Sequence, residues 1–125
     1  MSKAEQLNYK FILCPEGNDV ATALKWVMSS NSIAVMRKPT CETWFIEGVL
    51  KPNEHYIEVK EDYSDLEEKV DYYSSNTKEA EWILENAHNH VKQFQDPVLE
   101  EIILIKVLEK YFTLSTPELK CVLRY

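Results

Sequence analysis

The sequence predicts an α/β protein in which a short parallel sheet is flanked by helices and the chain ends in a helical segment. Two short apolar runs, Tyr9–Cys14 and Ile33–Met36, suit strands that are buried on both faces. A helix-forming segment, Val20–Ser30, separates them, and this order is typical of a right-handed parallel strand–helix–strand unit. After residue 60 the apolar residues recur at helical spacing, so helices close the chain.

The first strand is expected to end at Pro15-Glu16-Gly17, where proline and glycine interrupt the apolar run. Asn18 or Asp19 can then cap the helix predicted over Val20–Ser30. That helix would bury one apolar stripe, formed by Val20, Leu24, Val27 and Met28.

The middle of the chain is less regular. Glu42–Leu50 is ambiguous between a strand and a short helix, whereas His55–Val59 alternates well enough to be a third strand. Ser64 and Glu67 have the spacing of a capping box. The helix that they would start is expected to bury Leu66, Val70 and Tyr73.

Two helices are predicted to end the chain. Thr77 would cap the first, whose buried stripe is expected to be Ala80, Ile83, Leu84, Ala87, Val91 and Phe94. Asp96-Pro97 would start the second, with proline at the favoured first position. Its segment Ile102–Phe112 is apolar almost all round, which predicts packing on more than one side and self-association in isolation.

Length and composition suggest one domain over residues 1–125. The net charge of −7 argues against nucleic-acid binding, because such domains usually carry a basic excess. Cys14, Cys41 and Cys121 form no CxxC pair, which favours reduced thiols in the cytoplasm. We expect neither a signal peptide nor a membrane span, because no apolar stretch has the required character.

The turn at Gly17 is the first candidate site, because ligands in open α/β sheets bind beyond the carboxyl ends of strands. Thr22, Lys25 and Ser29 would share one polar edge of the predicted helix. Lys25 would point back toward Gly17 and could reach a phosphate. Glu16 and Asp19 would repel a phosphate, although a carboxylate can accept hydrogen bonds from sugar hydroxyls. A capped helix with a solvent-exposed lysine explains the same pattern, since one glycine is far from a phosphate-loop signature.

Arg37 and Lys38 would follow the second strand at the same edge and offset the two acids, or simply be solvated. Glu42 could bind a sugar hydroxyl or face water. His88 and His90 lie two apart on a helix and point to different faces, so we interpret them as surface residues and predict no metal site. His55 is interpreted as structural.

Several phrases in order resemble glycosyltransferase family 90, over roughly Gln6 to Phe112: "EGNDVAT", "LKWVMSSNS", "ETWF", "DYSDLEEK" and "NAHNHVKQF". The likeness is greatest to the bacterial lipopolysaccharide branch. It implies a GT-B-type fold of two Rossmann-like domains, of which this chain would be the C-terminal, donor-binding half. The N-terminal half, which in the family supplies most of the acceptor site and the proposed general base, would be absent, so no catalytic residue is assigned.

The resemblance implies a nucleotide sugar as donor substrate, no cofactor and no metal. It places the donor at Glu16, Gly17, Asn18, Asp19, Thr22, Lys25, Ser32, Lys38, Pro39 and Glu42. Two positions depart from the family pattern: Ala23 stands where eukaryotic relatives have arginine, and Arg37 where close relatives usually have proline.

The implied function is transfer of a sugar to a lipopolysaccharide or other cell-surface glycan, reached through the missing half or a companion chain. Such a protein would be cytoplasmic, either free or attached peripherally to the inner face of the membrane. The alternative is a truncated, inactive remnant or subunit that binds only a nucleotide or a partner chain.

Overall fold

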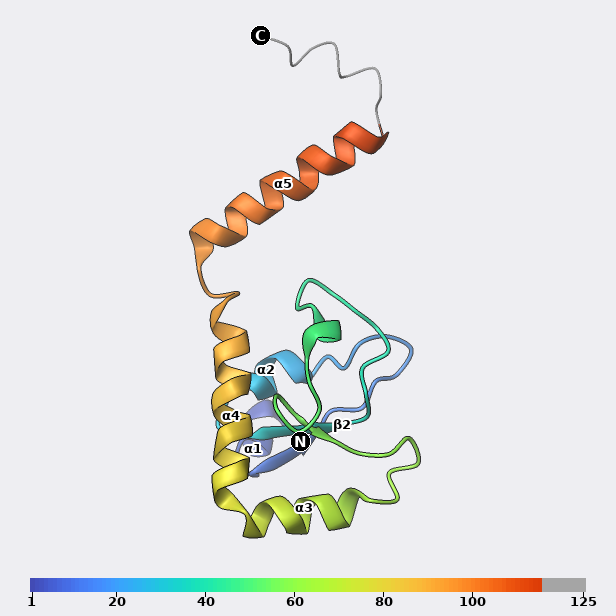
Figure 1. Ribbon diagram of the computed structural model, residues 1–125, viewed down its shortest axis with the longest axis vertical. Coiled ribbons are helices and arrows are strands. Elements are labelled where there is room, and N and C mark those ends of the chain that lie inside the picture. Colours follow the sequence, from blue (N-terminus) through green and yellow to red (C-terminus); the bar gives the residue numbers. More distant parts are fainter. Residues whose placement is uncertain (116–125) are drawn as a thin grey trace. The chain divides into compact units, whose positions relative to one another are not determined.

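The computed structural model describes residues 1–115, and its contacts divide the chain into two units (Figure 1). The first unit runs from Met1 to Lys92 and contains the sheet, and the second begins at Gln93. The expectation of a single domain over residues 1–125 stays a prediction.

The sheet has three parallel strands in the order β1 (Phe11–Leu13), β2 (Ile33–Met36) and β3 (Ile57–Glu58). Every residue of β2 is buried, as its unbroken apolar sequence predicts for a central parallel strand. The outer strands are shorter than the predicted Tyr9–Cys14 and His55–Val59, because only the residues opposite β2 find ladder partners. The parallel arrangement expected from the sequence is confirmed.

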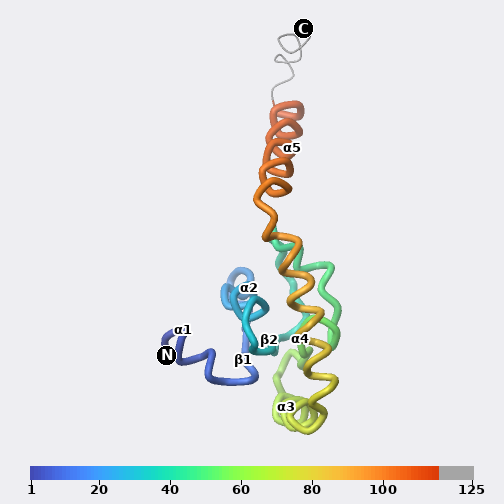
Figure 2. Tube along the Cα trace, turned by 90° about the vertical axis from the view of Figure 1, so that its left-hand side faces the viewer, coloured from blue at the N-terminus to red at the C-terminus, as the bar shows by residue number. Residues whose placement is uncertain are grey.

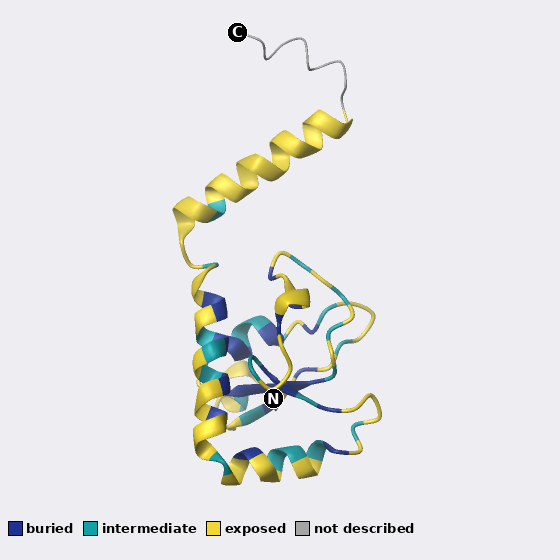
Figure 3. Cartoon of the chain, in the orientation of Figure 1, coloured by how far each residue is buried: buried dark blue, intermediate teal, exposed yellow. Residues whose placement is uncertain are grey.

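Helices cover both faces of the sheet. On one face Ile33 and Val35 of β2 pack with Tyr73 of α3 (Leu66–Ser75) and with Ile83 of α4 (Thr77–Lys92). Figures 1 and 2 show α2 and α3 on opposite sides of the strands. Figure 3 shows the buried side of α4 turned toward the strands. The predicted stripe of α4 is confirmed at four buried positions: Ala80, Ile83, Ala87 and Val91. Leu84 is half-buried against the same cluster, and Phe94 lies beyond the end of α4.

Helix α2 is much shorter than predicted. It spans Leu24–Met28, and its N-cap is Ala23 rather than Asn18 or Asp19. Asp19 Oδ1 instead accepts the N–H of the next residue, Val20, at 2.7 Å. Such local bonds compete with helix formation. The chain bends at residues 18–20, and Thr22 and Ala23 form a turn, so Thr22 is not on a helix.

One further local prediction is wrong, and an open one is decided. The capping box at Ser64 and Glu67 does not form, because α3 begins after Asp65, whose carboxylate accepts the Lys60 N–H at 2.8 Å. The ambiguous segment Glu42–Leu50 is a loop that contains the short 3-10 helix η1 (Glu47–Val49). An additional short helix, α1 (Lys3–Gln6), was not predicted and has a complete capping box formed by Ser2 and Glu5.

The second unit contains α5 (Pro97–Ser115), whose first turn is capped by Asp96 as predicted. No residue of α5 is buried, and apolar side chains are exposed all round it, including Ile102, Leu104 and Phe112. Its self-association stays a prediction, and Cys121 lies outside the described residues. Among the helices of residues 1–115, none has the length and apolar character needed to cross a membrane.

Candidate functional site

The loops that follow β1 and β2 leave the sheet at the same edge, because the two strands are parallel. In Figure 1 these loops lie on the side away from α4. The Glu16 carboxylate joins them: its oxygens accept the Thr40 N–H at 3.1 Å, the Thr40 hydroxyl at 2.7 Å and the Cys41 N–H at 3.3 Å. The negative charge of Glu16 is therefore used to hold the second loop against the first.

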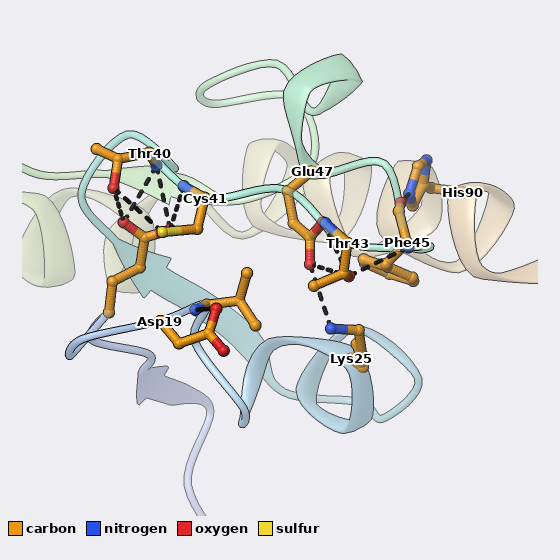
Figure 4. A network of polar contacts seen from close by, with 10 residues as sticks. Asp19, Lys25, Thr40, Cys41, Thr43, Phe45, Glu47 and His90 are labelled. Atoms are coloured by element: carbon orange, nitrogen blue, oxygen red, sulfur yellow. Dashed lines mark hydrogen bonds and ion pairs between the residues drawn. The ribbon is translucent and has the colours of Figure 1, made fainter. Parts of the chain in front are cut away.

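Lys25 forms an ion pair inside this site. Its Nζ lies 3.2 Å from Oε1 of Glu47, the first residue of η1 (Figure 4). The Glu47 side chain is only 2% exposed, whereas that of Lys25 is 24% exposed. Glu47 also accepts the Thr43 N–H at 2.7 Å and the Thr43 hydroxyl at 2.8 Å. Lys25 is thus fixed by a buried carboxylate rather than free in solvent.

Several donors keep Glu47 ionised. Burial alone would raise the pKa of the Glu47 carboxyl. The N–H and hydroxyl of Thr43, together with the ammonium of Lys25, outweigh burial and hold the pKa below its ordinary value. The pair therefore carries both charges at neutral pH, and the ammonium keeps donors that Glu47 does not use.

Two aromatic rings contact Lys25. Lys25 Nζ lies 5.5 Å from the ring centroid of Trp44 and 5.8 Å from that of Phe45. Ring faces attract cations at these distances. Phe45 is 2% exposed, while the side chain of Trp44 is 64% exposed. The lysine thus lies beside a buried ring and an exposed one, at the surface of the unit.

His90 attaches this loop to α4, contrary to its interpretation as a surface residue. It is 7% exposed, and its Nε2 donates to the Phe45 carbonyl at 3.1 Å. The ring of His55 lies 5.8 Å away and accepts the Lys51 N–H at Nδ1, so the structural role expected for His55 is confirmed. His88 is half-buried, and its Nε2 donates to the Ser30 carbonyl at 2.7 Å. These bonds need Nε2–H and, in His55, an unprotonated Nδ1.

We expect the unit to lose stability below about pH 6.5, the ordinary pKa of histidine. Burial lowers the pKa of His55 and that of His90 in the folded state, outweighing the groups that raise them. Both rings are neutral in either state above that pH, and below it the unfolded chain binds protons more readily. Urea unfolding from pH 7.5 to 5 measures the loss, and His90→Gln should flatten the slope. A slope unchanged in that variant would contradict this account.

The structure brings most of the predicted site residues to one edge. Glu16 lies in the loop after β1 with Gly17, Asn18 and Asp19, and Lys38, Pro39 and Glu42 follow β2. The Glu42 carboxylate lies against Gly48, where an added Cβ would be 2.9 Å from its Oε1. Ser32 is separate: it precedes β2 at the opposite edge, is buried, and donates its hydroxyl to the Tyr9 carbonyl at 2.8 Å.

Three residues of the site were missed from the sequence: Thr43, Trp44 and Glu47. The signal that could have found them was the segment "ETWFIEG", in which a second acid follows two aromatic residues. Its ambiguous periodicity hid the fact that it forms a loop beside Lys25. Within residues 1–115, no three His, Cys, Asp or Glu side chains come together as metal ligands.

Gly17→Ala is expected to raise the free energy of unfolding by about 0.4–1 kcal/mol, since alanine restricts the unfolded chain. An added Cβ would meet no atom within 4 Å, and the φ angle of Gly17 is not positive. Thermal unfolding provides the measurement. Gly48→Ala is the matched control and should bring no such gain, because its Cβ would press on Glu42. A less stable Gly17→Ala protein would show that the loop is packed differently.

Comparison with known proteins identifies the family of this chain. The model of glycosyl transferase family 90 matches residues 1–117. The chain belongs to glycosyl transferase family 90. It is 43% identical over 118 residues to O-glucosyltransferase LpsA of Dichelobacter nodosus, and 28% identical over 104 residues to protein O-glucosyltransferase 3 of Rattus norvegicus. An uncharacterized protein, 027R of frog virus 3, is 35% identical over 88 residues.

This family 90 chain spans only part of its relatives. The alignment with LpsA covers 94% of the chain but 37% of LpsA, and the rat alignment covers 82% of the chain and 20% of that protein. The alignment with the viral protein covers 66% of the chain and 9% of 027R. No solved structure matches the chain.

Proposed function

We propose that this chain is the donor-binding portion of a glycosyltransferase and holds a nucleotide sugar at the carboxyl edge of β1 and β2. The observation that carries the proposal is the joining of the two loops at this edge, with the Lys25 ammonium held beside them by Glu47. Family membership and the O-glucosyltransferase relatives support a glycosyltransferase with a glucosyl donor. The three-stranded sheet would be part of a Rossmann-like domain in a GT-B arrangement.

Each side chain has a role that its chemistry supports. The unused N–H donors of Lys25 would bind a phosphate oxygen and stabilise the departing nucleoside diphosphate. The open surface at Gly17 lets the ligand approach the backbone closely. Asp19 and Glu42 are exposed and would accept hydrogen bonds from sugar hydroxyls. The donor is a substrate in this scheme, and we propose no metal or other cofactor.

The acceptor would be a lipopolysaccharide or another cell-surface glycan, by analogy with LpsA. No residue is assigned as the general base that efficient transfer to a hydroxyl needs. A second candidate function is that of a donor-binding subunit. The chain aligns with 37% of LpsA, and transfer in this case requires residues that correspond to the rest of LpsA.

Calorimetry with UDP-, GDP- and ADP-glucose tests the proposal on the chain as it is. We expect saturable binding of at least one of them, with a dissociation constant in the millimolar range or tighter. Glucosyl transfer to water or to an added glycan then separates the two functions: binding with turnover indicates an enzyme, and binding without turnover a donor-binding subunit. A folded protein that binds none of the three at millimolar concentration would refute the donor site.

A further inference from the structure

Arg37 occupies a position that none of the contacts described above explains. It directly follows β2, and its guanidinium carbon lies 5.6 Å from the ring centroid of Tyr63. Tyr63 belongs to the loop after β3, so this contact joins the second and third loops at the carboxyl edge. The Glu16 bonds to Thr40 and Cys41 join the first and second loops at that same edge. All three loops are thereby linked in one row.

The charges at this edge are unevenly compensated. The ammonium of Lys25 faces the Glu47 carboxylate at 3.2 Å, and the Glu16 carboxylate accepts N–H and hydroxyl hydrogen bonds. In contrast, Arg37 forms no ion pair with any carboxylate of residues 1–115. In the adjacent loop, Asp62 accepts the Ser64 N–H and Asp65 the Lys60 N–H. A cation with unused donors at a ligand-binding edge is suited to an anion.

The ring beneath Arg37 is held in place at a cost in backbone conformation. Tyr63 has a φ of 58°, in the left-handed region that bulky residues rarely adopt. Its N–H bonds to the Lys60 carbonyl at 3.0 Å, and its side chain packs against the core cluster of the sheet. A guanidinium whose contact is a ring face, rather than a hydrogen-bond acceptor, keeps its N–H donors for two parallel bonds to a phosphate.

We propose that Arg37, in cation–π contact with Tyr63, is a second phosphate-binding residue of the donor site, which recognises a phosphate of a nucleoside diphosphate. The inference rests on the proposed donor site and extends it from the loop of Gly17 to the loop after β3. Lys38, the next residue, is exposed and adds positive charge without a fixed platform. Arg37 therefore offers an oriented guanidinium in addition to its positive charge.

Arg37→Met and Arg37→Lys test this inference by calorimetry with inorganic pyrophosphate and with the three nucleoside diphosphate glucoses. Lys10→Met is the matched control, because Lys10 Nζ lies 5.3 Å from the Phe11 ring but precedes β1, at the other edge of the sheet. We expect Arg37→Met to weaken binding about tenfold or more, and Lys10→Met to leave it nearly unchanged. Arg37→Lys should fall between them, since lysine keeps the charge and loses the fork. Circular dichroism confirms that each variant is folded.

The outcomes separate this inference from the proposed function. If the chain binds a nucleoside diphosphate glucose and Arg37→Met binds it equally well, the inference is wrong and the donor site stands. If Arg37→Met and Lys10→Met weakened binding equally, net charge alone would explain the effect, and the inference would be wrong. Pyrophosphate binding that depends on Arg37, without binding of any sugar nucleotide, would support the inference and refute the proposed function. Failure to bind either kind of ligand would refute both.

Discussion

Glu47→Ala is expected to lower the free energy of unfolding by about 3 kcal/mol, a loss typical of breaking a buried ion pair. The Glu47 carboxylate is 2% exposed and accepts from Lys25 and from both donors of Thr43. Its removal leaves the Thr43 N–H without its acceptor and opens a cavity under η1. Urea unfolding at pH 7.5 measures the change, and partial exposure of Lys25 sets the estimate at the low end of the range.

The control for this prediction is the exposed ion pair of Lys51 and Glu54. Its atoms are 3.3 Å apart, close to the distance in the buried pair, but the Lys51 side chain is 68% exposed. We expect Glu54→Ala to cost less than about 1 kcal/mol. If Glu47→Ala and Glu54→Ala were equally mild, Glu47 would not organise the loop around Lys25.

Lys25→Met is expected to weaken binding of a nucleoside diphosphate glucose about ten- to hundredfold, the range for losing a hydrogen bond to a charged group. Methionine keeps an apolar stem of similar length but removes the ammonium that would bind phosphate. Glu47 retains its bonds to Thr43, but its buried carboxylate loses its counter-charge, so some loss of stability is also expected. Calorimetry measures the affinity, and urea unfolding reports any accompanying loss of stability.

Lys51→Met removes a lysine of the same charge from the exposed pair and serves as the control. It should leave the affinity nearly unchanged, because Lys51 contacts only Glu54 among the charged residues described. Identical affinities for the Lys25→Met protein and the unaltered chain would remove Lys25 from the donor site. Equal loss in the two lysine variants would indicate long-range charge alone.

The parts of the fold that the sequence predicted correctly depend on local apolar patterns. β2 is a short, unbroken apolar run, which is typical of a buried strand. α4 has its apolar residues at helical spacing, which predicts an amphipathic helix. The start of α5 was equally clear, because Asp96 and Pro97 are both favoured at a helix N-terminus. The parallel pairing of β1 and β2 followed from the helix between them.

The parts that were missed depend on contacts between distant residues. Lys25 and Glu47 are 22 positions apart, and no local pattern links them. The loop that carries Glu47 also places Ile46 at a φ of 56°, a conformation that a β-branched residue rarely adopts. Similarly, aspartate is a favoured helix-capping residue, but the Asp19 carboxylate accepts the N–H of Val20, and α2 begins only at Leu24. At this edge, side-chain hydrogen bonds and ion pairs therefore outweighed the local preferences for helix and strand.

Nuclear magnetic resonance mapping with the nucleoside diphosphate glucose that binds best tests most directly where the ligand lies. Backbone amide shifts should concentrate in the loops after β1 and β2, at residues 16–19 and 38–43, and at Lys25. Amides at the opposite edge, including those of Lys10 and Ser32, should change little. Shifts confined to that opposite edge or to α4, with residues 16–19 unaffected, would contradict the placement of the donor at the carboxyl edge.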